Sequence, residues 1–265
     1  MAVTEAVQLA PETRTRTRWT RLASLGLLVQ GLAPVLMLTT ATLWGMDMGE
    51  ETGFFAAVAA IVLTCAFLVY RFGTWSKVVG IVGALVGAGT MFWTAFGLTH
   101  FPSFFDVLPG LMVIPGALIA IVSCVAAIVA GRRGHRSAEA VGGEAVAIRV
   151  FVAALALAAL VTGTLTFAGR SSVADADTVI AAKDFAFEGP VRVEGGSKIV
   201  VRNDDPYFHT ATVEAFGVDE GLTAGRSVEI RVPDRPGTYV LYCKPHTSDA
   251  KNPGEDDMAT RLIVS

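Results

Sequence analysis

Long apolar runs without charged residues fill roughly the first two thirds of the chain and limit what it can fold into. A helix needs about 20 such residues to cross the hydrocarbon core of a membrane. Five runs suit this role, and none contains Asp, Glu, Lys or Arg. We predict membrane-spanning helices at residues 23–43, 54–70, 78–98, 107–130 and 150–168. The composition agrees, because 52% of the residues are hydrophobic and only 17% are charged.

Basic residues alternate between the segments that connect these runs. They gather before the first run, after the second and after the fourth, whereas the first and third loops contain none. They are Arg14, Arg16, Arg18, Arg21, Arg71, Lys77, Arg132, Arg133, Arg136 and Arg149. Because basic loops stay on the cytoplasmic side, we expect a cytoplasmic tail at residues 1–22. The same rule places everything after residue 168 outside the cytoplasmic membrane.

The predicted spans contain no residues that indicate ion transport, proton transfer or haem binding. None holds a charged side chain that could mark an ion or proton path, and none holds a histidine that could ligate haem. Cys65 and Cys124 lie inside apolar runs, where a thiol usually acts as a small buried hydrophobe. We therefore expect the five helices to be a lipid-embedded anchor or docking platform. The sequence contains no basic stripe, so nucleic acid is not an expected partner.

The last third of the chain has a different character. After an expected linker at residues 169–177, short runs rich in β-branched residues alternate with Gly, Pro, Asn and Asp turns. We predict strands at residues 178–182, 191–193, 198–203, 209–214, 227–232, 237–243 and 259–264. Regular short strands with such turns predict an all-β domain over residues 178–265, an antiparallel sandwich or barrel.

One set of side chains in this region could bind a metal ion. Its only two histidines are His209 and His246, its only cysteine is Cys243, and its only methionine is Met258. One thiolate, two imidazoles and one weak axial thioether form the ligand set of a blue copper site. Zinc suits this set less well, because a thioether is a poor fourth ligand for zinc. The residues predict one copper ion at one end of the sandwich.

The same region resembles the cupredoxins of the plastocyanin and pseudoazurin type. The resemblance extends from about residue 179 to 264, about a third of the chain, and the matching pieces are AAKDFAFEG, VRVEGGSKIVVRNDD, FHTATV, PGTYVLYCKPH and MATRLIV. The resemblance implies a Greek-key sandwich, copper bound by His209, Cys243, His246 and Met258, and one-electron transfer. It also implies that Asn203 and Thr210 fix the loop around the first histidine.

The chain departs from the family pattern between the last two ligands. Eleven residues, 247–257, separate His246 from Met258, where the family usually has a few. A loop can lengthen in the middle while its ends stay fixed, since doubling its length costs only about 0.6 kcal/mol. Asp256 and Asp257 stand beside Met258, and a carboxylate could compete for the axial position. We favour Met258, because sulfur serves Cu(I) better than oxygen does.

The leading interpretation is a membrane-anchored electron carrier rather than an enzyme. Its partners would be membrane lipid and a redox protein at the outer surface, and no small-molecule substrate is evident in the sequence. In such sites the loop histidine, here His246, is usually the edge nearest solvent and the entry point for the electron.

Two other interpretations remain open. The first is copper storage, sensing or delivery, for which Met46, Met48 and His100 in the outer loops could supply further ligands. The second is a degenerate cupredoxin that only binds partners, although the intact Cys and His set argues against it.

Overall fold

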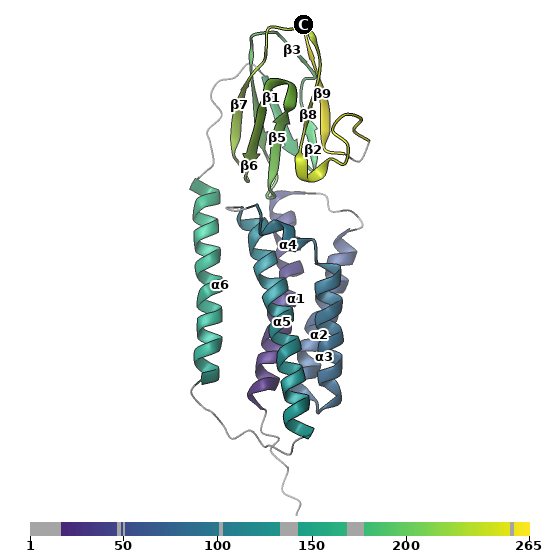
Figure 1. Ribbon diagram of the computed structural model, residues 1–265, viewed down its shortest axis with the longest axis vertical. Helices are drawn as coiled ribbons and strands as arrows, with labels where there is room; N and C mark the ends of the chain where they lie inside the picture. Colours follow the sequence, from purple (N-terminus) through teal and green to yellow (C-terminus); the bar gives the residue numbers. More distant parts are fainter. Residues whose placement is uncertain are drawn as a thin grey trace, which may run out of the picture.

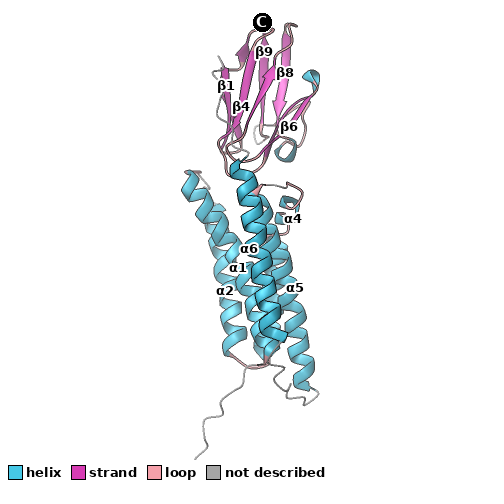
Figure 2. Ribbon diagram, turned by 90° about the vertical axis from the view of Figure 1, so that its left-hand side faces the viewer, coloured by secondary structure: helices cyan, strands magenta, loops and turns pink. Residues whose placement is uncertain are grey.

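The computed structural model describes residues 17–46, 49, 51–100, 103–132, 143–168, 178–254 and 257–265. The chain forms a helical bundle with a β-sandwich stacked on one end of it (Figure 1). The last residue lies at the end of the sandwich that points away from the helices (Figure 2). The expected linker at residues 169–177 lies outside the described residues.

The described residues contain six helices rather than five. They are α1 (Arg18–Trp44), α2 (Glu51–Arg71), α3 (Trp75–Thr90), α4 (Thr94–Gly97), α5 (Phe104–Arg132) and α6 (Gly143–Ala168). By length and composition, α1, α2, α5 and residues 148–168 of α6 can cross a membrane, and α3 is a shorter apolar helix. The bundle is thus a membrane region, as predicted, with a different number of helices.

The extra helix arises inside the third predicted span. Residues 91–93 break that span into α3 and α4, and the Thr94 hydroxyl donates to the carbonyl of Met91 at the break. The short α4 lies very close to α5, because a Cβ on Gly97 would lie 2.3 Å from the carbonyl oxygen of Asp106. The single continuous helix predicted over residues 78–98 is therefore wrong.

Close packing holds α1 against α5. A Cβ on Gly26 would lie 2.5 Å from the Gly116 carbonyl oxygen, so only glycine permits this approach. In contrast, α6 stands beside the others and joins α5 near its sandwich-facing end, where Phe104 N–H donates to the Thr166 hydroxyl at 2.9 Å (Figure 1). Only 11% of an apolar 18-residue stretch of α6 is buried, against 50% of the corresponding stretch of α1. Helix α6 therefore leaves a broad apolar surface for lipid.

The sandwich consists of two sheets. Its strands are β1 (Thr178–Lys183), β2 (Ala186–Glu188), β3 (Arg192–Val193), β4 (Lys198–Asn203), β5 (His209–Val213), β6 (Val218–Leu222), β7 (Ser227–Arg231), β8 (Gly237–Tyr242) and β9 (Ala259–Val264). The first sheet has the order β2-β1-β4-β7 and the second β3-β9-β8-β5-β6. Two short 3-10 helices, η1 (Glu214–Phe216) and η2 (Lys244–His246), follow β5 and β8.

The sheets are mixed, which corrects the antiparallel sandwich that we expected. Strand β1 runs parallel to β4, and β3 runs parallel to β9. The chain leaves the first sheet after β2, places β3 in the second sheet and returns at β4, so β4 runs in the direction of β1. Strands β2 and β6 lie outside the predicted set.

An apolar core fills the space between the sheets. Strand β4 shows how it forms, because Ile199 and Val201 are fully buried in this core while Lys198, at the start of the strand, is exposed. The core residues are Ile180, Val193, Ile199, Val201, Ala211, Val213, Leu222, Ile230, Val232, Leu241, Leu262 and Val264. This core gives the loops at each end of the sandwich a rigid base.

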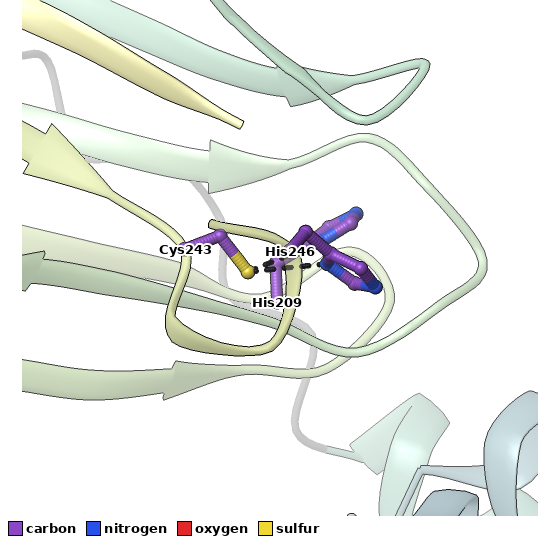
Figure 3. Close-up of side chains that lie close together, drawn as sticks. All are labelled: His209, Cys243 and His246. Atoms are coloured by element: carbon purple, nitrogen blue, oxygen red, sulfur yellow. Dashed lines mark hydrogen bonds between the residues drawn. The ribbon is translucent and has the colours of Figure 1, made fainter. Parts of the chain in front are cut away.

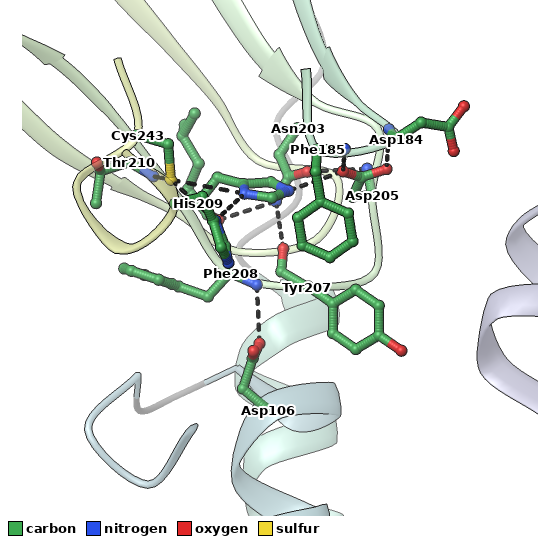
Figure 4. Close-up of polar contacts among 12 residues, drawn as sticks. Asp106, Asp184, Phe185, Asn203, Asp205, Tyr207, Phe208, His209, Thr210 and Cys243 are labelled. Atoms are coloured by element: carbon green, nitrogen blue, oxygen red, sulfur yellow. Dashed lines mark hydrogen bonds and ion pairs between the residues drawn. The ribbon is translucent and has the colours of Figure 1, made fainter. Parts of the chain in front are cut away.

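The loop between β4 and β5 docks on the bundle. Tyr207 is buried within the apolar cluster of the helices. The backbone N–H of Phe208 donates to the Asp106 carboxylate in the first turn of α5 at 2.8 Å (Figure 4). The ring of Phe208 also stacks on His100, with 4.7 Å between ring centroids. The end of the sandwich that carries this loop therefore faces the helices.

Candidate metal centre

Three predicted ligands converge at that end of the sandwich (Figure 3). His209 opens β5, Cys243 follows β8, and His246 ends η2. Because β5 and β8 are neighbours in one sheet, the strands bring the first histidine beside the loop that carries the other two residues. Cys243 and His209 are fully buried, and His246 is half-buried.

The three ligand atoms fit one metal ion. The Cys243 sulfur lies 3.7 Å from His209 Nδ1 and 3.3 Å from His246 Nδ1, and the two nitrogens are 3.2 Å apart. Metal bonds of about 2.0–2.3 Å in a trigonal plane separate ligand atoms by about 3.5–3.8 Å. Shifts of a few tenths of an ångström would therefore satisfy a shared ion. Among the described residues, no other group of His, Cys, Asp and Glu has this property.

The site favours the thiolate form of Cys243. Burial alone would keep the thiol protonated, but hydrogen bonds and charges from His209 and His246 outweigh it and lower the pKa of Cys243 to about 6. A thiolate is the form that binds a metal.

Asp205 is a functional residue that the sequence analysis missed. Its carboxylate lies 2.8 Å from His209 Nε2, and both side chains are fully buried. Burial lowers the pKa of His209, but hydrogen bonds to Asp205 and Cys243 prevail and raise it to about 9. By bonding Nε2, Asp205 turns Nδ1 toward the cysteine sulfur.

Asp205 also holds a second loop in place. It accepts hydrogen bonds from the backbone N–H groups of Asp184 and Phe185, at 2.8 and 3.2 Å (Figure 4). Both residues have positive φ angles, 50° and 57°, which non-glycine residues rarely adopt. The turn places the Phe185 ring edge-to-face against His246 and His209. One carboxylate thus orients a histidine and the ring that covers it.

Asn203 and Thr210 lie beside the site. The Asn203 side chain donates to the carbonyl oxygens of Tyr207 and Leu222 and accepts from the N–H of Asp205. The backbone N–H of Thr210 donates to the Cys243 sulfur at 3.3 Å, and its hydroxyl accepts from Lys244 N–H. These bonds tie the loop before His209 to the loop after Cys243.

Met258 is tied to the same loop. It is buried and packs against Cys243 and Ala182. Its carbonyl accepts from Cys243 N–H at 2.9 Å, and its N–H donates to the His246 carbonyl at 3.0 Å. The backbone of Met258 is therefore fixed next to the ligands despite the long loop before it.

The competing carboxylate of Asp257 has other partners. It accepts from the N–H groups of Ser248 and Gly254, both at 2.7 Å, and these bonds lower the pKa of Asp257. The carboxylate thereby closes the exposed loop. Asp256 lies outside the described residues.

The candidate ligands of the outer loops lie outside the three-residue cluster, although His100 and His246 line one cavity. Met46 packs against the apolar core of the bundle, and His100 stacks on Phe208. Neither belongs to the group that could hold an ion. Met48 lies outside the described residues.

Comparisons with known proteins add little to this picture. No family model and no curated protein matches the chain. A variant of amicyanin in the Cu(I) state is 17% identical over 36% of this chain and 87% of that one, with a TM-score of 0.28. The periplasmic domain of subunit II of cytochrome oxidase from Bradyrhizobium japonicum is 17% identical over 36% and 88%, with a TM-score of 0.24. A haem-copper terminal oxidase dimer is 14% identical over 46% and 97%, with a TM-score of 0.25.

The two-sheet sandwich and the His209–Cys243–His246 cluster at one end of it fit a cupredoxin domain, and that domain is joined to apolar membrane helices.

Proposed function

We propose that this protein is a membrane-anchored type 1 copper protein that transfers single electrons and converts no substrate itself. The observation that carries the proposal is the convergence of His209 Nδ1, Cys243 Sγ and His246 Nδ1, all within 4.8 Å of one another. One thiolate and two imidazoles are the equatorial ligands of such sites, and Met258 is the axial ligand we propose. Bound copper would supply a one-electron couple between Cu(I) and Cu(II).

The residues around the site support electron transfer by holding the ligand side chains in fixed positions. Asp205 fixes the His209 ring, Thr210 donates to the Cys243 sulfur, and the rigid sheets carry both. Ligands that cannot move keep similar positions in both oxidation states of the metal, which lowers the rearrangement that each electron requires.

A copper titration of the full chain tests the proposal. We expect one Cu(II) per chain, an intense visible absorption band and reversible reduction with one electron. Binding of Cu(I) without a reversible Cu(II) state would contradict electron transfer and favour copper storage or delivery. Binding of more than one ion per chain with no intense band would contradict the site.

The axial position has its own test. Met258→Gln replaces a thioether with an amide oxygen, which favours Cu(II), so the reduction potential should fall and the visible spectrum should change. Asp257→Asn is the matched control, because the neighbouring carboxylate bonds to loop amides. It should alter both properties much less. The opposite order of effects, measured by redox titration, would give the axial role to Asp257.

We also propose that the sandwich lies outside the cytoplasmic membrane. The basic residues that alternate between the loops support this orientation, which puts the tail before α1 in the cytoplasm. An alkaline phosphatase reporter fused after Ser265 should be active, whereas one inserted after Arg132 should be inactive. Activity of the second fusion would refute the orientation.

A further inference from the structure

A cavity separates the metal-site end of the sandwich from the helices. It has a volume of about 480 Å³ and adjoins a second of about 810 Å³. The two share Met37, Trp93, Asp106, Tyr207 and His246 as lining residues. Volumes of roughly 300–1,000 Å³ are typical of small-molecule sites. The half-buried ligand His246 therefore lines a partly open space beside the bundle.

The cavity holds a polar group without a partner. Tyr207 is 6% exposed, and its hydroxyl makes no hydrogen bond. The ring is fixed by the bundle cluster on one side and by Phe185 on the other, with 5.8 Å between the two ring centroids. Its hydroxyl points away from the metal site and toward the helices (Figure 4). A buried hydroxyl in this state needs a bound partner, because leaving it unpaired costs free energy.

The other walls are mainly apolar. Phe96 of α4 and Phe105 and Pro109 of α5 line the first cavity, and Phe54 and Phe55 of α2 line the second. The only carboxylate that lines both is Asp106, which already accepts hydrogen bonds from Ser103 and Phe208. An apolar space with a few polar groups, at the end of helices that can cross a membrane, selects a flat amphipathic molecule.

We propose that this cavity binds a molecule of the quinone and hydroquinone class drawn from the membrane. A ring oxygen would pair with the Tyr207 hydroxyl, the ring would lie among Trp93, Phe105 and His246, and an apolar tail would follow the second cavity past Phe54. The proposal deepens the proposed function, on which it rests, by naming the class of redox partner that reaches the loop histidine. No sequence motif marked this cavity, because Tyr207, Trp93 and His246 come from separate parts of the chain.

Binding can be measured on the full, copper-loaded chain in detergent micelles. The probe is benzoquinone with a decyl tail, which quenches tryptophan fluorescence, and Trp93 lines both cavities. We expect saturable quenching at one molecule per chain. Tyr207→Phe keeps the ring and removes the hydroxyl, and the loss of one hydrogen bond should weaken binding roughly tenfold. Trp93→Phe should remove most of the quenching.

Tyr239→Phe is the matched control. Its hydroxyl donates to the Arg235 carbonyl at an exposed position, and its ring packs on Phe216 away from the cavities. It should leave the affinity unchanged. Quenching that does not saturate, or that is equal in Tyr207→Phe and the parent protein, would overturn the proposal. So would a phospholipid that copurifies at one per chain and excludes the quinone.

The same samples separate this inference from the proposed function. Copper content and visible absorption report the metal centre without any quinone. A normal copper spectrum with no quinone binding would overturn only the quinone site. A chain that binds the quinone but forms no one-electron copper centre would overturn the proposed function and, with it, the role of the bound molecule.

Discussion

Cys243→Ser should abolish the intense visible absorption of the copper-loaded protein. That absorption arises from charge transfer between the thiolate and Cu(II), and a serine oxygen cannot supply it. The sandwich should still fold, because Cys243 lies at one end of the domain and the core between the sheets is made by other residues. The measurement is the visible spectrum of the full chain after addition of one equivalent of Cu(II).

Cys124→Ser is the control for this change. Its thiol is buried between helices of the bundle and belongs to a different cluster from Cys243. The control should keep the full band. A band that survives in Cys243→Ser, or that disappears in Cys124→Ser while Cys243 is intact, would remove Cys243 from the site.

Asp205→Ala should destabilise the metal-free sandwich by about 3 kcal/mol, because it leaves buried groups without their partner. In the variant, His209 Nε2 and the N–H groups of Asp184 and Phe185 lose their hydrogen-bond partner. Labelling of the buried Cys243 thiol over a urea series reports unfolding of this domain. The transition should move to lower urea. An unchanged transition would mean that the carboxylate contributes nothing to stability.

Asp204→Ala is the matched control one residue away. Its carboxylate pairs with Arg202 at the surface, where an ion pair is worth less than about 1 kcal/mol. The two variants should also respond differently to pH. The folded-state pKa of His209 is raised to about 9, so the stability from its charged form is full below about pH 6.5 and declines as pH rises through 9. The loss of unfolding free energy caused by Asp205→Ala should therefore become smaller at high pH. The loss caused by Asp204→Ala should not show this pH dependence.

Three of the predicted ligands could be recognised from residue type and spacing. Cys243 and His246 are three positions apart on one loop, and the pairing of β5 with β8 brings His209 beside them, as the cupredoxin resemblance implied. The apolar runs likewise predicted a membrane bundle, because length and hydropathy decide whether a helix can cross a bilayer.

Other features depend on packing that local patterns do not encode. Residues 91–93 are as apolar as their neighbours, so hydropathy could not show that α4 breaks away from α3 to meet α5. Strand β6 carries Asp219 and Glu220, which hide it from a hydrophobic pattern. In the sequence, Asp205 looks like one of several turn residues. Only the folded loop shows that its carboxylate forms a hydrogen bond with His209.

The docking of the β4–β5 loop on α5 affects the direction from which a redox partner can reach the metal site. The Asp106–Phe208 hydrogen bond and the buried Tyr207 hold the metal-site end of the sandwich against the helices, so His246 lies beside the bundle. A water-soluble protein that approaches from above meets the opposite tip of the sandwich, where the chain ends (Figure 2). A water-soluble partner would therefore have to approach the side of the molecule between sandwich and helices, where His246 lines the cavities, whereas a molecule dissolved in the membrane would arrive there directly.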